Sequence, residues 1–187
     1  QKALTHFRAI SDRRLPDAKV SLNLTAANLR MDEFVSDMQD EVLLAGLSPH
    51  QIQLELLETI FFDERDNPFV RQCHLLREAG FGLALDDFGT GHAAIATLRQ
   101  FAVSCIKIDR SLVQDIDSDS ELQVSTAAII DLANRLGIAV LAEGVETATE
   151  QITLQKMGCH RAQGYLHARP MPLDQLKVFL KDRDLVN

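Results

Sequence analysis

The sequence predicts one α/β domain built on a parallel sheet, a (β/α)8 barrel with about six of its βα units present in this chain. Six short apolar runs alternate with helical patterns along the 187 residues, as in parallel sheets with right-handed crossovers. Polar residues stand near the C-terminal end of every run, and a barrel gathers residues from most strand ends at one face. A doubly wound open sheet, the alternative, concentrates its ligands at one switch point.

The predicted elements follow one another without a linker, a low-complexity tract or a proline-rich stretch. The opening segment QKALTHFRAI has neither an initiator Met nor a signal-peptide pattern, and we interpret it as the inside of a helix of something longer. Residues 18–25 alternate between apolar and polar side chains with the period of a strand. The other predicted strands are 52–59, 81–87, 103–109, 138–145 and 160–166.

Apolar residues at helical spacing predict a helix after each strand. The first helix carries its apolar stripe on Met31, Phe34, Val35, Met38, Val42 and Ala45. The helices that follow include 66–79, a short one around Leu98, a long one with Val124 and Ala128, one with Ile152 after the capping residue Thr147, and one that begins near Pro172. Glycine, which readily adopts the left-handed conformation at a helix end, closes four of them: Gly46, Gly80, Gly137 and Gly158.

Composition narrows the class of protein. A formal net charge of −8 argues against a nucleic-acid groove made of basic residues, but it permits a phosphate ligand whose charge metal ions offset. No apolar run is long enough to cross a membrane. The odd number of cysteines, without a C-x-x-C pair, favours a reducing, cytoplasmic location. Zinc binding by Cys73-His74 and Cys159-His160 is disfavoured, because neighbouring residues rarely chelate one metal together.

The polar residues at the strand ends have the chemistry of a hard-cation site. In order they are Asn23, Glu55 with Glu58, Asp86 and Asp87, Lys107 with Asp109, Glu143 with Glu146, and Gln163. A buried Glu is costly unless it is paired or metal-bound. Several carboxylates that converge with an amide oxygen and a single Lys suit Mg²⁺ or Mn²⁺. Each residue alone also has an ordinary structural explanation, such as a turn or a solvated charge.

Five segments, in this order and spacing, resemble the EAL domain family of cyclic di-GMP phosphodiesterases. They are VSLNLT, LALDDFGTG, CIKIDRSLV, VLAEGVET and GCHRAQGYLHARPMP, and the resemblance extends over essentially the whole chain. The resemblance implies a modified TIM barrel that hydrolyses cyclic di-GMP to 5′-pGpG at a two-metal site. It also implies bacterial second-messenger signalling, a homodimer, and attached sensory or GGDEF-type domains.

The resemblance further implies a role for each matched residue. Asn23, Glu55 and Asp86 would hold one Mg²⁺ or Mn²⁺, and Asp86, Asp87 and Glu143 the second. Lys107 would act as general base or position the attacking water, with support from Glu146 and Gln163. The remaining assignments are Glu58, Gly89, Thr90 and Gly91 to the dimer-linked loop, and Asp109, Arg169 and Pro170 to substrate binding.

The chain also departs from the family pattern. No Glu-Ala-Leu segment precedes Asn23, so we expect the first barrel strands and the glutamate that they contribute to lie before Gln1. Leu57, Leu112 and the His92-Ala93-Ala94 stretch replace the family's Thr, Phe and Tyr-Ser-Ser. A catalytically silent cyclic di-GMP receptor is therefore the main alternative. A metal-dependent lyase of small acids is the more distant one.

Overall fold

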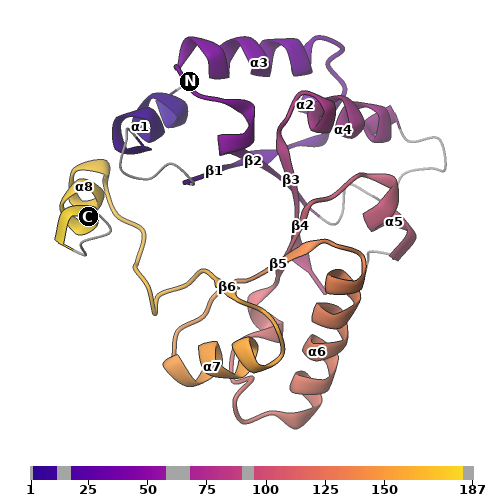
Figure 1. The fold of residues 1–187 in the computed structure, drawn as a ribbon, viewed down its shortest axis with the longest axis vertical. Helices are drawn as coiled ribbons and strands as arrows, with labels where there is room; N and C mark the ends of the chain where they lie inside the picture. Colours follow the sequence, from indigo (N-terminus) through magenta and orange to yellow (C-terminus); the bar gives the residue numbers. More distant parts are fainter. Residues whose placement is uncertain (1, 12–17, 58–67, 90–94, 183–187) are drawn as a thin grey trace.

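One parallel sheet dominates the computed structural model, which describes residues 2–11, 18–57, 68–89 and 95–182 (Figure 1). Its six strands are hydrogen-bonded in chain order, β1-β2-β3-β4-β5-β6. The strands are β1 (Val20–Leu24), β2 (Ile52–Leu57), β3 (Gly82–Phe88), β4 (Cys105–Ile108), β5 (Ala139–Ala142) and β6 (Arg161–Ala162). Consecutive strands lie side by side, as the barrel prediction requires, and the predicted α/β class is confirmed.

Helices connect these strands and lie on the outer side of the arc that the sheet forms (Figure 1). The described α-helices are α1 (Lys2–Ser11), α2 (Ala26–Leu29), α3 (Phe34–Leu44), α4 (Pro68–Glu78), α5 (Ile95–Gln100), α6 (Ser120–Arg135), α7 (Ala148–Lys156) and α8 (Leu173–Asp182). Two 3₁₀ turns, η1 (Pro49–Gln51) and η3 (Arg110–Leu112), add to them. Among the described residues no helix has both the length and the apolar character needed to cross a membrane.

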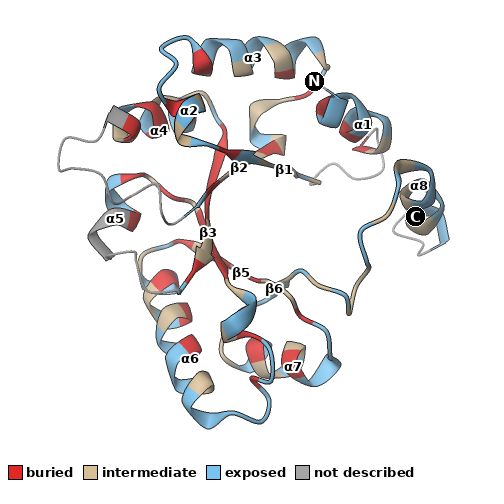
Figure 2. Cartoon of the chain, turned by 180° about the vertical axis from the view of Figure 1, so that it is seen from behind, coloured by how far each residue is buried: buried red, intermediate tan, exposed pale blue. Residues whose placement is uncertain are grey.

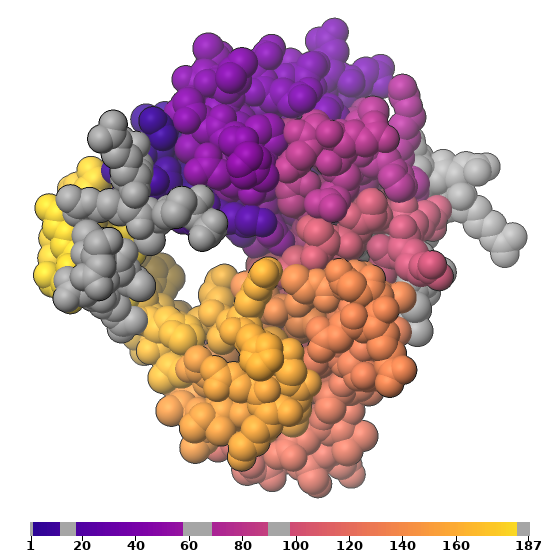
Figure 3. All heavy atoms as spheres, in the orientation of Figure 1, coloured from indigo at the N-terminus to yellow at the C-terminus, as the bar shows by residue number. Residues whose placement is uncertain are grey.

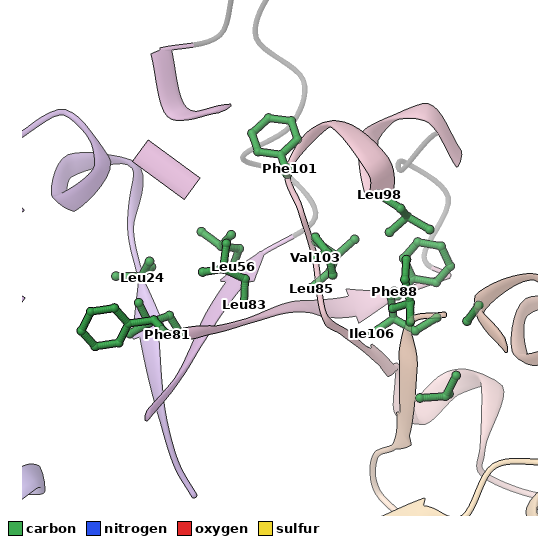
Figure 4. Close-up of a cluster of buried hydrophobic side chains, with 14 of the residues drawn as sticks. Leu24, Leu56, Phe81, Leu83, Leu85, Phe88, Leu98, Phe101, Val103 and Ile106 are labelled. Atoms are coloured by element: carbon green, nitrogen blue, oxygen red, sulfur yellow. The ribbon is translucent and has the colours of Figure 1, made fainter. Parts of the chain in front are cut away.

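Alternation along the strands gives the sheet two different faces. In β2, Ile52, Leu54 and Leu56 are fully buried, whereas the residues between them are only partly buried. The buried set belongs to the hydrophobic core that also contains Leu76 of α4 and Leu98 of α5. Buried parts of the chain are red in Figure 2. Figure 4 shows side chains of β2, β3 and β4 together with Leu98, Phe101 and Val103 from the region of α5. The other face of the sheet is therefore left for polar residues, which is where the predicted ligands fall.

Some details of the predicted elements are wrong. The first predicted helix is two helices, α2 and α3, and Met31 lies between them with half of its surface exposed. Val124 and Ile152 are also exposed, because the buried faces of α6 and α7 centre on Ile130 and Leu154. The predicted strands are mostly too long, since polar loops begin soon after the paired residues.

The predicted helix ends are confirmed by backbone geometry. Gly46, Gly80, Gly137 and Gly158 follow their helices with φ between +68° and +94°. Thr147 caps α7 with its side chain, as expected.

Figure 3 shows an opening between the N-terminal elements in indigo and purple and the C-terminal elements in orange and yellow.

Candidate functional site

Lys107 lies at the centre of a carboxylate cluster at the C-terminal ends of the strands. Its Nζ atom is 3.0 Å from Oε1 of Glu55, 2.8 Å from Oδ1 of Asp86 and 2.7 Å from Oε1 of Glu143. Only 7% of the Lys107 side chain is exposed, so water competes little for these charge-assisted contacts. One ammonium thus joins four neighbouring strand ends.

Strand register accounts for this convergence. Glu55 alternates in β2 with the buried leucines, and Lys107 alternates in β4 with buried isoleucines. Side chains at every second position of a strand point to the same face, so both point away from the helices. Glu143 follows β5, and its backbone N–H donates to the carbonyl of Ile108 at 3.1 Å, which continues the ladder beyond the strand.

Asp86 and Asp87 sit at an irregularity in β3. The pairing with β4 shifts between Leu85 and Phe88, and Asp87 has a φ of +55°. In a regular strand these two side chains would point to opposite faces, but a bulge with a left-handed residue can turn both toward one side. The N–H of Asp87 donates to Oδ1 of Asp86 at 3.2 Å. Strained backbone of this kind is concentrated at functional sites.

The two aspartates and Glu143 fit a divalent cation. One oxygen from each of Asp86, Asp87 and Glu143 lies within 4.8 Å of the others. Oxygens bonded to one Mg²⁺ or Ca²⁺ at about 2.0–2.6 Å are at most about 4–5 Å apart, so this spacing is compatible with a shared ion. Carboxylate oxygens are also the donors that these hard cations prefer.

The charges in the cluster shift one another's pKa. Burial by itself lowers the pKa of Lys107, but hydrogen bonds to Asp86, Glu143 and Glu55 outweigh it and raise that pKa above its ordinary value. Burial raises the pKa of Glu143, and the contact with Lys107 offsets only part of this rise. The cluster therefore holds Lys107 as an ammonium, and Glu143 gains a proton more readily than a solvated glutamate does.

A hollow of about 260 Å³ adjoins the cluster. Its lining residues are Arg110, Glu143, Gly144, Glu146, Gln163, Gly164 and Tyr165. Arg110 Nη2 contacts Glu146 Oε1 at 2.9 Å across its rim. The guanidinium of Arg169 lies 4.2 Å from the ring centre of Tyr165. The hollow thus combines carboxylates with the cation of Arg110 and with an aromatic ring that Arg169 contacts, which suits a phosphate ligand with a planar base.

Comparison with protein families identifies the chain. The model of the EAL domain matches residues 1–170. The chain belongs to the EAL domain family.

Relatives of this EAL domain include "Cyclic di-GMP phosphodiesterase NbdA" from Pseudomonas aeruginosa, 36% identical over 87% of this chain and 21% of the relative. The "Bifunctional diguanylate cyclase/cyclic di-GMP phosphodiesterase MucR" of the same organism is 33% identical over 86% of this chain and 23% of its own length. A solved structure of Klebsiella pneumoniae BlrP1, a manganese/cy-diGMP complex, has a TM-score of 0.80 and 34% identity, and the match covers 90% of this chain and 43% of that one. The chain thus spans about a fifth of the length of these curated relatives.

Other described residues that the sequence predicted for this EAL domain are not among the ion-pair partners of Lys107. Asn23 is exposed on β1, although it is in register with Glu55. Asp109 caps η3 by accepting the N–H of Ser111 at 2.9 Å, and its contacts with Ser111 lower its pKa. Pro170 is exposed, and Glu58, Thr90 and Gly91 lie outside the described residues.

Gly89 has a φ of +105°, and a Cβ atom there would lie 2.3 Å from Cδ1 of Leu112. The turn after β3 therefore requires glycine. Leu112, one of the departures from the EAL pattern, therefore packs next to Gly89.

Sequence reasoning missed three residues of this region: Arg110, Tyr165 and Glu150. Arg110 and Tyr165 stand inside the quoted motifs, but nothing in the sequence shows that they face the hollow. Glu150 had a detectable signal, because Thr147 followed three residues later by a glutamate is a capping box. The cap alone does not show that its carboxylate also reaches another loop of the EAL domain.

Proposed function

We propose that this EAL domain hydrolyses cyclic di-GMP to linear 5′-pGpG at a site with two Mg²⁺ or Mn²⁺ ions. The observation that carries the proposal is the convergence of Asp86, Asp87 and Glu143 beside Lys107 on one face of the sheet. Two relatives are named cyclic di-GMP phosphodiesterases, and the proposed substrate is taken from them. Because the chain matches only part of those relatives, the activity of the whole protein belongs to the proposal.

The proposed ligand sets share one residue. Asp86, Asp87 and Glu143 hold one ion, and Asp86 with Asn23 and Glu55 holds the other. Bound dications supply a water of lowered pKa and neutralise charge on the phosphate. Asn23 is the least constrained ligand, because it is exposed at the edge strand β1, whereas Glu55 is already fixed by its contact with Lys107.

Two roles are open to Lys107. As an ammonium it orients the attacking water and offsets negative charge on the phosphate, and the raised pKa is consistent with this role. As a general base it must lose its proton, which requires that nearby cations lower its pKa. Lys107→Arg separates the two roles, because a guanidinium stays charged and can orient water but cannot take up a proton.

The hollow beside the cluster is the proposed place for the rest of the substrate. Arg110 and Arg169 offer positive charge to the phosphates, and the ring of Tyr165 offers a surface for a guanine base. Gln163 and Glu146 line the same hollow and are proposed to support the reacting water. Asp109 and Pro170 complete the proposed substrate contacts.

The proposal also includes the setting of the domain. Residues 1–187 are proposed to form one domain that acts in the cytoplasm as a homodimer. The dimer-linked loop covers about residues 87–96 and includes Gly89, by resemblance to the EAL family. Attached GGDEF or sensory domains are expected, since a relative is named a bifunctional diguanylate cyclase/phosphodiesterase.

The direct test is turnover by the full protein. Incubation with cyclic di-GMP and Mn²⁺ is expected to yield pGpG, measured by chromatography and mass spectrometry. Lys107→Ala is expected to lower kcat at least about 100-fold. Absence of pGpG, or equal turnover by Lys107→Ala, contradicts the proposal. Binding of cyclic di-GMP without hydrolysis in metal-replete buffer instead supports the silent receptor.

A further inference from the structure

Glu150 is a buried carboxylate that lies outside the metal cluster. It occupies the first turn of α7, and only 4% of the residue is exposed. Its Oε2 atom accepts the N–H of Glu146 at 2.8 Å and that of Thr147 at 3.0 Å. Its Oε1 atom accepts the N–H of Asp115 at 3.2 Å. One side chain therefore collects three backbone donors.

Two of these bonds belong to the helix cap and one does not. Thr147 and Glu150 form a capping box, which accounts for the bond to the N–H of Thr147, and the N–H of Glu146 is next to it. Asp115 lies 35 residues earlier, in the turn after η3, where its φ is +63°. A helix cap does not require this long-range bond. The role of the bond therefore depends on the two segments that it connects.

The bond joins the two loops that follow Lys107 and Glu143. At the strand ends, Lys107 contacts Glu143 at 2.7 Å, and farther along the loops Arg110 contacts Glu146 at 2.9 Å. The Arg110–Glu146 pair is about half exposed, and such pairs contribute little because water and salt screen them. The bond from Asp115 to Glu150, in contrast, is accepted by a side chain of a residue that is only 4% exposed.

We propose that Glu150 is a positioning residue that joins the loop after β4 to the loop after β5 and so holds Lys107 and Glu143 in contact. The inference rests on the proposed function only for the identity of the cation. Outer-shell contacts of this kind commonly change metal affinity or activity by about 10- to 100-fold when they are removed.

The ionisation state of Glu150 agrees with this arrangement. Burial raises the pKa of its carboxyl, but the backbone N–H groups of Glu146, Thr147 and Asp115 outweigh it and lower the pKa below the ordinary value. The group is therefore a carboxylate, with both oxygens free to accept.

Glu150→Gln separates the bridge from the cap. The single amide oxygen of Gln can keep the two donors of Glu146 and Thr147, and a capping box tolerates Gln. The amide NH₂ then faces the N–H of Asp115, and this donor loses its acceptor. The variant therefore keeps α7 capped while it breaks the link between the two loops.

The experiment compares the full protein with Glu150→Gln, and with Asp119→Asn as a matched control that makes the same carboxylate-to-amide change at the cap of α6. In metal-free buffer, hydrogen exchange at the Asp115 amide is expected to rise about 10-fold in Glu150→Gln, whereas exchange at Thr147 stays unchanged. Calorimetry with Mn²⁺ alone is expected to show about 10-fold weaker binding in Glu150→Gln and unchanged binding in Asp119→Asn.

Each outcome is decisive. Unchanged exchange at Asp115 overturns the link between the loops. Faster exchange with unchanged Mn²⁺ affinity overturns the positioning role while the metal site stands. If the parent protein binds no Mn²⁺, the proposed metal site fails, and the exchange result alone supports or overturns the link. Cyclic di-GMP turnover is not needed for either measurement.

Discussion

The two halves of the strand-end face differ in how firmly they hold their polar residues. At β3, β4 and β5, Asp86, Lys107 and Glu143 are in direct contact and mostly buried. At β1, Asn23 is exposed, and at β2 only Glu55 reaches the cluster, through Lys107. Strands with a neighbour on each side fix their side chains by packing, whereas the edge strand β1 has only β2 beside it in the described sheet. The two halves should therefore respond differently to substitution.

The largest expected effect is loss of the shared ligand. Asp86→Asn removes the negative charge and one of the two oxygens of the residue that both proposed ligand sets share, so Mn²⁺ affinity and kcat are expected to fall more than about 100-fold. Asn23→Ala removes one neutral ligand from the less constrained half and is expected to cost about 10-fold. Calorimetric Mn²⁺ titration and pGpG formation measure both. Equal losses in the two variants would show that the halves contribute equally.

The second expected effect concerns stability rather than activity. In Lys107→Met the carboxylates of Glu55, Asp86 and Glu143 lose their ammonium, and an uncompensated buried charge costs about 3–5 kcal/mol. Urea unfolding with EDTA present measures this loss. Addition of Mn²⁺ is expected to restore part of it, because a dication can replace the ammonium.

Arg110→Met is the control for this prediction. It breaks the exposed pair with Glu146 and is expected to cost less than about 1 kcal/mol, with no dependence on Mn²⁺ beyond that of the parent. A Lys107→Met protein as stable as Arg110→Met in EDTA contradicts the view that the β3–β5 half is held by this one cation.

The fold was predictable because its signals are local. Alternation in residues such as Ile52, Leu54 and Leu56 indicates a strand with one buried face, and glycines such as Gly137 mark helix ends by their left-handed backbone. The strand ends were less predictable, because the strand-like pattern continues past the last residue that pairs with a neighbouring strand. The break between α2 and α3 at Met31 was missed, since tertiary packing decides whether an apolar residue is covered.

The site was predictable in its residue types but not in its geometry. In a regular strand adjacent aspartates point to opposite faces, whereas the bulge at Asp86 and Asp87 brings oxygens of both to Glu143. A bulge depends on pairing with β4, which the sequence of β3 does not contain. The bond between Asp115 and Glu150 was missed for a similar reason, because contacts between distant loops leave no periodic pattern.

A third, smaller effect is the pH dependence of stability in the β3–β5 half. The lowered pKa of Glu150 contributes stability above its ordinary value of 4.5, and this contribution is lost as pH falls through the folded pKa. The raised pKa of Glu143 acts in the opposite sense, because its contribution is greatest below 4.5 and is lost as pH rises through the folded pKa.

Urea unfolding in EDTA between about pH 3 and pH 6 tests both signs. Glu150→Gln is expected to flatten the loss of stability on the acidic side, and Glu143→Gln to steepen it relative to the parent. The same slope in all three proteins would contradict the assigned shifts.

The smallest expected effect tests how closely the loops after β4 and β5 approach each other. Gly144 and Gly137 have the same φ of +70°, but a Cβ at Gly144 would lie 2.6 Å from Cγ of Arg110, whereas nothing lies within 4 Å at Gly137. Ala at either position pays about 1 kcal/mol for left-handed backbone. Gly144→Ala must in addition displace Arg110 from Glu146, so it is expected to lose about 1 kcal/mol more in urea unfolding.

Gly144→Ala is also expected to raise KM for cyclic di-GMP a few-fold, whereas Gly137→Ala leaves KM unchanged. Equal stabilities and equal KM values for the two variants would mean that the loops have room to separate, and the buried bond to Glu150 would then be the link that keeps Lys107 and Glu143 together.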